Sequence, residues 1–164
     1  MSNRPEPVPA PKARSARGKR FLRSRAPKPV EDAKSVLFVR GTRTSPVVND
    51  ALAELCALKK PWGVLHTRGL EAHPFEDAGP VEAAANRADA ALFVLGSSTK
   101  KRPDTLVIGR IHDRAVLDMA EVRISALRRV SDFAGLPPGV GLKPALAFVG
   151  AAWDDDARLG TLRS

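Results

Sequence analysis

The sequence has a single cysteine, Cys56, among 164 residues. One cysteine excludes an internal disulfide and leaves too few thiolates for a structural zinc site, which favours a reducing compartment. Cys56 follows Leu52 by one helical turn, so we interpret it as a small core or boundary residue and not as a nucleophile.

Long apolar runs are also missing. The longest, Ala90–Leu95, is too short to span a bilayer, and the N-terminus has no apolar core like that of a signal peptide. The Arg- and Ser-rich start resembles a mitochondrial transit peptide, but its alternating prolines oppose the amphipathic helix that such a peptide needs. We therefore expect a soluble, intracellular protein.

Signatures of catalysis are scarce. The histidines, His66, His73 and His112, lack HExxH-like spacing, and the glycine-rich pieces Gly96–Lys101 and Gly135–Lys143 do not have the intervals of a phosphate-binding loop. These patterns favour surface histidines and ordinary turns over a metal or nucleotide site.

Three acids, Asp113, Asp118 and Glu121, are close enough in sequence to hold a divalent metal or act as acid and base. No nucleophile or second ligand set accompanies them, so we predict no catalysis, no cofactor and no metal. Asp118 and Glu121 are better explained as ion-pair partners of nearby arginines, namely Arg110, Arg114 or Arg123.

Positive charge is abundant, with 27 Lys and Arg against 18 acids and a net charge of +9. This balance makes nucleic acid the first partner to consider and an anionic membrane surface the second, while the alternative is a merely soluble basic protein. A hydrophobic fraction of 43% over this length suffices for one domain with a real core plus a tail.

The charge is concentrated in residues 1–34, which hold ten Lys or Arg, three acids and six of the fourteen prolines. Few of these residues can be buried, so we predict a tail that is disordered when free and orders on RNA. Its cations would neutralise phosphates or form a nuclear localisation signal, and the alternative is a tail that only solubilises. They are Arg14, Arg17, Lys19, Arg20, Arg23, Arg25 and Lys28.

After the tail, Val36–Val39 is typical of a strand. A helix is predicted next, with Ser45 as N-cap, Pro46 at its first position and Pro61 beyond its end. Its expected apolar face consists of Val47, Ala51, Leu55 and Leu58, with Val48 and Leu52 beside it.

Trp62–His66 is a second predicted strand. A short helix follows over Val81–Arg87, starting at Pro80 and capped by Asp77 or Gly79. Ala90–Leu95 is apolar on both faces and is therefore expected to be a central strand. This β-α-β-α-β order indicates an α/β fold.

Two further strands are predicted at Thr105–Ile111 and Leu117–Ile124, joined through residues 112–114, with Val130 and Phe133 covering the sheet. Beyond them we expect a linker at Gly135–Gly141, a last strand and a solvated acidic loop. The last two are Ala145–Val149 and Asp154–Asp156.

Between the third and fourth predicted strands, Gly96 opens a polar turn that carries Lys100, Lys101 and Arg102 and is stopped by Pro103. Cations held on a rigid sheet suit a polyanion, so we predict that these three contact RNA and set its register, with Arg110 as a fourth member. The alternative is that they keep the turn solvated or pair with a partner's carboxylates.

These residues also carry a resemblance. The run GSSTKKRPDTLVIGR (96–110), followed by VLDMAE (116–121), resembles the ribosome production factor 2 branch of the Brix-domain family, a group of eukaryotic ribosome-assembly proteins. Matching blocks flank it in order: RFLRSRAPKPVEDAK (20–34), LKKP (58–61), PFED (74–77) and KPALAFVG (143–150).

The resemblance implies a domain of two similar α/β halves. It places the basic tail at residues 1–34, the first half at 35–134, and a linker with the start of the second half at 135–164, so the chain is expected to be a fragment or a shortened factor.

The function implied is that of a non-enzymatic assembly factor for the large ribosomal subunit, located in the nucleus and nucleolus. It would act with the regulator of ribosome synthesis protein to bring 5S rRNA and its two ribosomal proteins into the precursor particle. The alternatives are another Brix-family factor, including one for the small subunit, a generic basic RNA-binding module, or an RNA-modifying enzyme such as a nuclease.

Overall fold

The computed structural model describes residues 15–25, 33–135, 138–142, 145–157 and 159–160, and the chain divides into two compact units, Met1–Asp32 and Ala33–Ser164. In the first unit, α1 (Ala16–Arg25) is a helix, whereas the sequence predicts disorder throughout the tail. The helix contains neither proline nor a β-branched residue, and Ser15 Oγ accepts a hydrogen bond from Gly18 N at its start (3.0 Å). The rest of the predicted tail, residues 1–14 and 26–32, lies outside the described residues.

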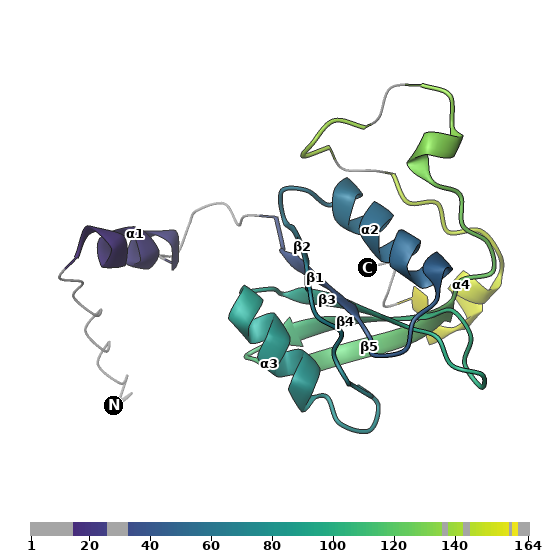
Figure 1. The fold of residues 1–164 in the computed structure, drawn as a ribbon, viewed down its shortest axis with the longest axis horizontal. Coiled ribbons are helices and arrows are strands. Elements are labelled where there is room, and N and C mark those ends of the chain that lie inside the picture. Colours follow the sequence, from purple (N-terminus) through teal and green to yellow (C-terminus); the bar gives the residue numbers. More distant parts are fainter. Residues whose placement is uncertain (1–14, 26–32, 136–137, 143–144, 158, 161–164) are drawn as a thin grey trace, which may run out of the picture. The chain divides into compact units, whose positions relative to one another are not determined.

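The second unit is built on a five-stranded sheet in the order β2-β1-β3-β4-β5 (Figure 1). The strands β1 (Val36–Arg40), β2 (Gly63–Leu65) and β3 (Leu92–Ser97) are parallel. The strands β4 (Thr105–His112) and β5 (Ala115–Arg123) continue the sheet in antiparallel fashion. The predicted α/β class and all five of these strands are therefore confirmed.

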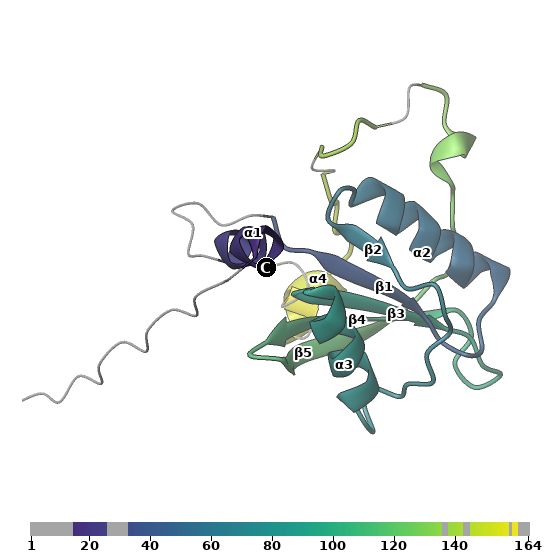
Figure 2. The ribbon, with the colours of Figure 1, turned by 60° about the vertical axis from the view of Figure 1, so that its left-hand side comes forward.

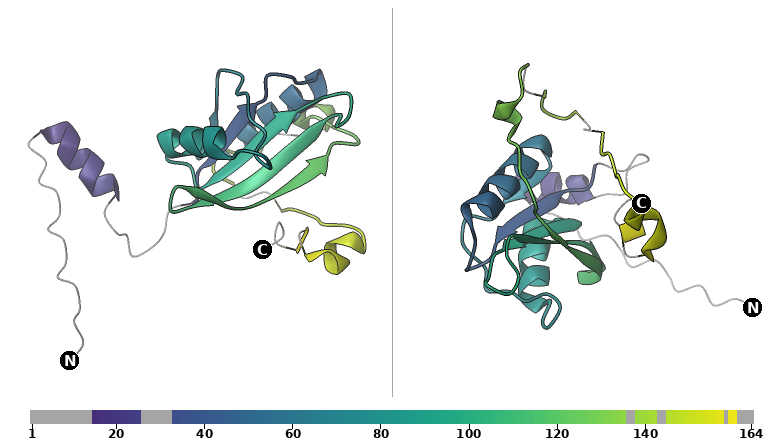
Figure 3. Two further views of the ribbon diagram at one scale, coloured as in Figure 1. Left: turned by 90° about the horizontal axis from the view of Figure 1, so that it is seen from below. Right: turned by 90° about the vertical axis from the view of Figure 1, so that its right-hand side faces the viewer.

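Two helices cover opposite faces of this sheet, α2 (Pro46–Leu58) on one and α3 (Gly79–Ala88) on the other (Figure 3). The chain thus follows the predicted β-α-β-α-β order before it enters β4. As predicted, β3 is central, since it hydrogen-bonds to β1 on one side and to β4 on the other.

The core has two layers because neighbouring strand residues point to opposite faces. Under α3, the buried strand residues pack with Val81, Ala84 and Ala85; they are Leu37, Val39, Phe93, Leu95 and Val107. Under α2, they pack with Val48, Leu52 and Cys56; they are Val36, Phe38, Val94 and Leu106.

The predicted ends of α2 are confirmed. Ser45 is the N-cap and its Oγ accepts a hydrogen bond from Val48 N (3.2 Å), Pro46 occupies the first helical position, and the helix ends at Leu58, before Pro61. These are local signals that need no tertiary partner.

The predicted buried face of α2 is wrong by about one residue. Val47 and Leu55 are 37% and 38% exposed, and the buried residues are Val48, Ala51, Leu52 and Cys56. The reason lies in β3, because a Cβ at Gly96 would be 2.5 Å from Val48 Cγ1 and 2.9 Å from Leu52 Cδ1. The missing side chain of Gly96 lets these two residues approach the sheet. β3 also continues past Gly96 to Ser97, so the polar turn begins later than predicted.

The predicted cap of α3 needs a correction too. The N-cap position is Ala78, which makes no side-chain capping bond, and Asp77 Oδ1 instead accepts a hydrogen bond from Gly79 N (2.9 Å). Farther along, Glu82 Oε1 accepts from Val116 N (2.8 Å) and so ties the helix to β5.

Two predictions beyond β5 are wrong. Ala145–Val149 is not a strand, and Val149 is 86% exposed. A strand needs a ladder partner for its backbone groups, and in the described part of the chain no strand pairs with this segment. Phe133 is 58% exposed and so does not cover the sheet. It follows a 3-10 turn, η1 (Val130–Asp132). This turn is held against α2, since Val130 N donates a hydrogen bond to Glu54 Oε2 (3.3 Å).

The predicted acidic loop is also partly helical, since α4 (Ala152–Asp155) includes two of its three acids. Nearby, the rings of Phe148 and Trp153 meet edge to face with centroids 4.7 Å apart. Among the residues described, no helix is both long and apolar enough to cross a membrane.

Replacing Gly109 with Ala is expected to lower the free energy of unfolding by roughly 2 to 3 kcal/mol, because the core would be overpacked. The new Cβ would lie 2.5 Å from Phe93 Cζ and 2.9 Å from the Asp118 carbonyl oxygen, and Phe93 is fully buried. Gly69→Ala is the matched control, since its Cβ would meet its nearest atom at 3.4 Å. Urea denaturation measures both, and equal stabilities would contradict this account of the core.

Candidate nucleic-acid interface

Three connections leave the sheet at the same edge, because parallel strands share the edge at which they end. They are residues 41–45 after β1, 66–78 after β2 and 98–104 after β3, and Figure 2 shows them on its right-hand side. The backbone joins them directly: Gly41 N donates to Gly96 O, and Leu70 N donates to Arg40 O, each at 2.8 Å. We call this the carboxyl edge.

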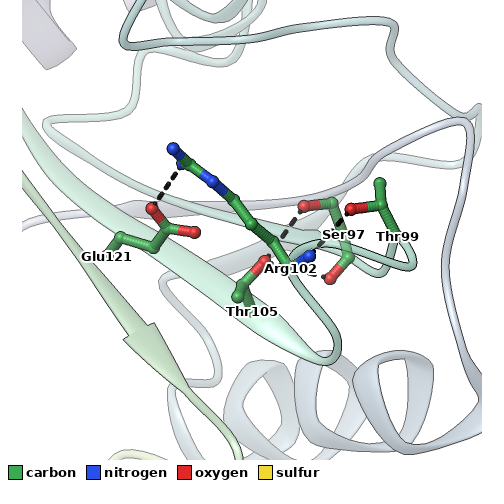
Figure 4. Close-up of polar contacts among 5 residues, drawn as sticks. All are labelled: Ser97, Thr99, Arg102, Thr105 and Glu121. Atoms are coloured by element: carbon green, nitrogen blue, oxygen red, sulfur yellow. Dashed lines mark hydrogen bonds and ion pairs between the residues drawn. The ribbon is translucent and has the colours of Figure 1, made fainter.

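The β3–β4 connection is a tightly closed turn. Thr99 N donates to Arg102 O (3.0 Å), and Arg102 N donates in return to Thr99 Oγ1 (3.1 Å). Where the strands enter the turn, Thr105 Oγ1 donates to Ser97 O (3.2 Å), as Figure 4 shows. These bonds hold the predicted cations, residues 100–102, at the tip of a hairpin.

Asp104 anchors this turn to α2. Its Oδ1 accepts hydrogen bonds from Ser45 Oγ (2.5 Å) and Ser98 Oγ (3.1 Å), and its backbone N donates to Ser98 Oγ (3.2 Å). Its φ of 49° lies in the left-handed region, which Asp tolerates better than most residues. The N-cap of α2 and the cationic loop therefore share one carboxylate.

The three loop cations are exposed but not equivalent. Within the described part of the chain, Lys100 and Lys101 have no hydrogen-bond or ion-pair partner. Arg102 Nη1 donates to Glu121 Oε2 of β5 at 2.8 Å (Figure 4). The prediction that Glu121 pairs with Arg110, Arg114 or Arg123 is wrong, because the pairing register of β4 and β5 turns Glu121 toward the loop.

Arg110 is not part of this group. It lies five residues beyond Thr105, about 17 Å farther along β4, and pairs in the sheet with Leu92 at the start of β3. Its Nε donates to both carboxylate oxygens of Asp118, at 2.8 and 3.0 Å, which confirms one of the predicted pairings. This hydrogen bond from Arg110 holds the pKa of Asp118 below its ordinary value despite some desolvation. The geometry therefore does not make Arg110 a fourth loop cation.

The cations predicted in the tail fall partly on α1. Arg17, Lys19 and Arg20 are exposed there. Arg23 and Arg25 belong to the same helix, but their side chains lie outside the described residues, as do Arg14 and Lys28 altogether. Their predicted contact with RNA remains a prediction.

Three arginines at the carboxyl edge were not predicted from the sequence. Arg40 ends β1, Arg43 follows it, and Arg68 follows β2. The signal that finds them is strand direction, since ligands of open α/β sheets bind outside the carboxyl ends of parallel strands.

A catalytic alternative gains no support from the geometry. In the described ranges, no three His, Cys, Asp or Glu side chains cluster as a metal site would require. Burial raises the pKa of the Cys56 thiol, and nearby Lys60 offsets this only in part, which favours an unreactive core residue.

Replacing Asp104 with Ala is expected to lower the free energy of unfolding by about 1 to 2 kcal/mol, since two hydroxyls lose their acceptor. Amide hydrogen exchange across residues 99–102 should become faster. Asp104→Asn is the control, because it keeps the Oδ1 acceptor and tolerates the left-handed backbone, and its effect should be smaller. Equal effects of the two changes on exchange would contradict the anchoring role.

Known proteins resemble this chain over most of its length. The Brix domain matches residues 41–164. A "Ribosome production factor 2 homolog" of Caenorhabditis elegans is 39% identical over 154 residues, which is 92% of this chain and 52% of that protein. The protein of the same name from Homo sapiens is 39% identical over 143 residues, 87% of this chain and 47% of that protein.

The fission yeast Schizosaccharomyces pombe has a protein of the same name that is 40% identical over 143 residues, 87% of this chain and 45% of that protein. The chain thus spans about half the length of the curated relatives that it matches. The predicted resemblance is confirmed, and the Brix match covers β2 to β5, the helices α2 and α3 and the cationic loop. The chain belongs to the Brix domain family.

Proposed function

We propose that this chain is a non-enzymatic assembly factor for the large ribosomal subunit. The observation that carries the proposal is the cationic loop, which is fixed at the sheet edge by Asp104 and lies inside the matched Brix domain. The similarity to proteins named ribosome production factor 2 homologs supports a role in ribosome production.

The proposed mechanism is placement of RNA without bond-making chemistry. Lys100 and Lys101 are exposed on a closed turn, so the backbone that carries them need not be ordered when they bind phosphates. The basic residues of α1 add cations from the tail. Phosphate contacts of this kind fix register and orientation.

The proposed cargo is the 5S ribonucleoprotein, that is 5S rRNA with its ribosomal proteins, which the factor helps bring into pre-ribosomes in support of rRNA maturation. Its proposed protein partner is the regulator of ribosome synthesis protein, and its location is the nucleus and nucleolus. The similarity to proteins named ribosome production factor 2 homologs supports a role in ribosome production, and the net charge of +9 agrees with RNA binding.

Replacing Lys100, Lys101 and Arg102 with Ala, with the tail kept, should weaken binding to a 5S rRNA transcript. The slope of log K against log salt should flatten by up to about 2, since each phosphate contact to single-stranded RNA contributes roughly 0.7. The matched control is Lys59, Lys60 and Arg87 changed to Ala, which removes the same charge at the other edge of the sheet. If the loop variant no longer bound the protein partner but still bound RNA, the RNA-binding role of the loop would be refuted.

Deleting residues 1–34 should likewise weaken RNA binding and flatten the salt slope, since this segment has a net charge of +7 from ten cations and three acids. Each lost contact again counts for roughly 0.7 in the slope. Salt titrations of the deleted and full chains measure the difference. An unchanged slope would rule out a backbone-binding tail.

A further inference from the structure

The carboxyl edge carries cations on all three of its connections and not only on the loop after β3. Arg43 and Arg68 are exposed, on the connections after β1 and β2, and Arg40 at the end of β1 is half-buried. The opposite edge of the sheet, where the parallel strands begin, is formed by other residues. Substitutions at the two edges can therefore be compared for their effect on binding.

Backbone contacts fix the order of these connections across the edge. Ser98 N donates to Arg43 O (2.9 Å), which places Arg43 beside the cationic loop. Gly41 forms a parallel bridge with Leu70, and a Cβ on Gly69 would lie 3.4 Å from Gly41 O. The segment after β1 therefore lies between the Arg68 connection on one side and the loop on the other.

Arg40 is a positioning residue in this arrangement. Its Nη2 donates to Thr67 O at 3.1 Å, so the guanidinium at the end of β1 holds the residue directly before Arg68. His66 Nδ1 lies 2.8 Å from Arg68 O and also constrains that backbone. Arg68 thus projects from a segment held at two points.

The acids next to the loop are already occupied. Asp104 accepts from Ser45 and Ser98, and Glu121 accepts from Arg102. Glu71, Glu76 and Asp77 are exposed farther along the β2–α3 connection, beyond the bridge at Leu70 and away from the path from Arg68 to the loop. From Arg68 through Arg43 to the loop, positive charge therefore outweighs the negative charge that remains unpaired.

We infer that Arg43 and Arg68 extend the cationic loop into one phosphate-binding strip, which takes the backbone of a single RNA strand along the carboxyl edge. A row of exposed cations on three fixed segments matches a ligand whose negative charge repeats along its length. The strip crosses the end of β1 next to β3, where the direction of the connections changes, which is the ligand position expected in an open α/β sheet. This inference rests on the proposed RNA-binding function.

The test changes Arg43 and Arg68 to Ala in the full chain and measures binding to a 5S rRNA transcript between 50 and 200 mM salt. Loss of two phosphate contacts should flatten the slope of log K against log salt by roughly 1.4, so the affinity deficit should be about sevenfold larger at the lower salt. Lys60 and Arg87 changed to Ala form the control, since both are exposed at the opposite edge and remove the same charge. The control should keep the wild-type slope more closely than the edge variant.

A second variant separates charge from structure. Arg43→Lys with Arg68→Lys should restore the slope, because a lysine also supplies a point charge to phosphate. Thermal unfolding of all variants should be unchanged, since both arginines are exposed. Failure of the lysine pair to restore the slope would overturn the phosphate assignment.

The remaining outcomes separate this inference from the proposed function. If the loop variant loses RNA affinity while the Arg43 and Arg68 variant behaves like its control, the strip is wrong and the proposed function stands. If the Arg43 and Arg68 variant loses the protein partner with an unchanged salt slope, the edge binds an acidic protein and the inference is overturned. If the wild-type chain binds no RNA, the proposed function fails and the strip falls with it.

Discussion

The arrangement of this fold depends on β3 being buried on both faces while it bonds to a parallel strand on one side and an antiparallel strand on the other. Phe93 and Leu95 lie in the layer beneath α3, and Val94 lies in the layer beneath α2. Because β4 returns directly, a short hairpin follows β3 where a helical crossover would otherwise be needed. The hairpin leaves the end of the parallel strands open to solvent, and the exposed cations are found there.

Much of the fold could be predicted because its signals are local. Ser45 and Pro46 specify the start of α2 whatever surrounds them, and a run such as Ala90–Leu95 indicates a two-sided buried strand on its own. The buried face of α2 could not be found this way, since it depends on the space that Gly96 leaves on β3. The prediction of a strand at Ala145–Val149 failed for a related reason, because an apolar run becomes a strand only when another strand offers its backbone groups.

The candidate site likewise has features that could be predicted from the sequence and features that could not. The loop cations could be located because a buried strand and Pro103 bound them in the sequence. Of the ion pairs, Arg110 with Asp118 was among the predicted pairings, because the two residues face each other in the β4–β5 hairpin. The pair of Glu121 with Arg102 was not predicted, because Arg102 lies in the loop before β4 and has no partner in the strand register. To place the edge arginines together, one must know the order of the strands in the sheet, and no local sequence pattern contains that order.

Ser45 couples two parts of the molecule through one hydroxyl group. Its oxygen accepts from Val48 N within α2, and its proton goes to Asp104 in the cationic loop. Opening either contact removes one of the two hydrogen bonds that orient this hydroxyl, so the first turn of α2 and the loop are coupled through Ser45. By thermodynamic linkage, any ligand that binds only the closed loop raises the free energy needed to fray the helix terminus. A ligand bound at the carboxyl edge would therefore slow the hydrogen exchange of amides in the first turn of α2.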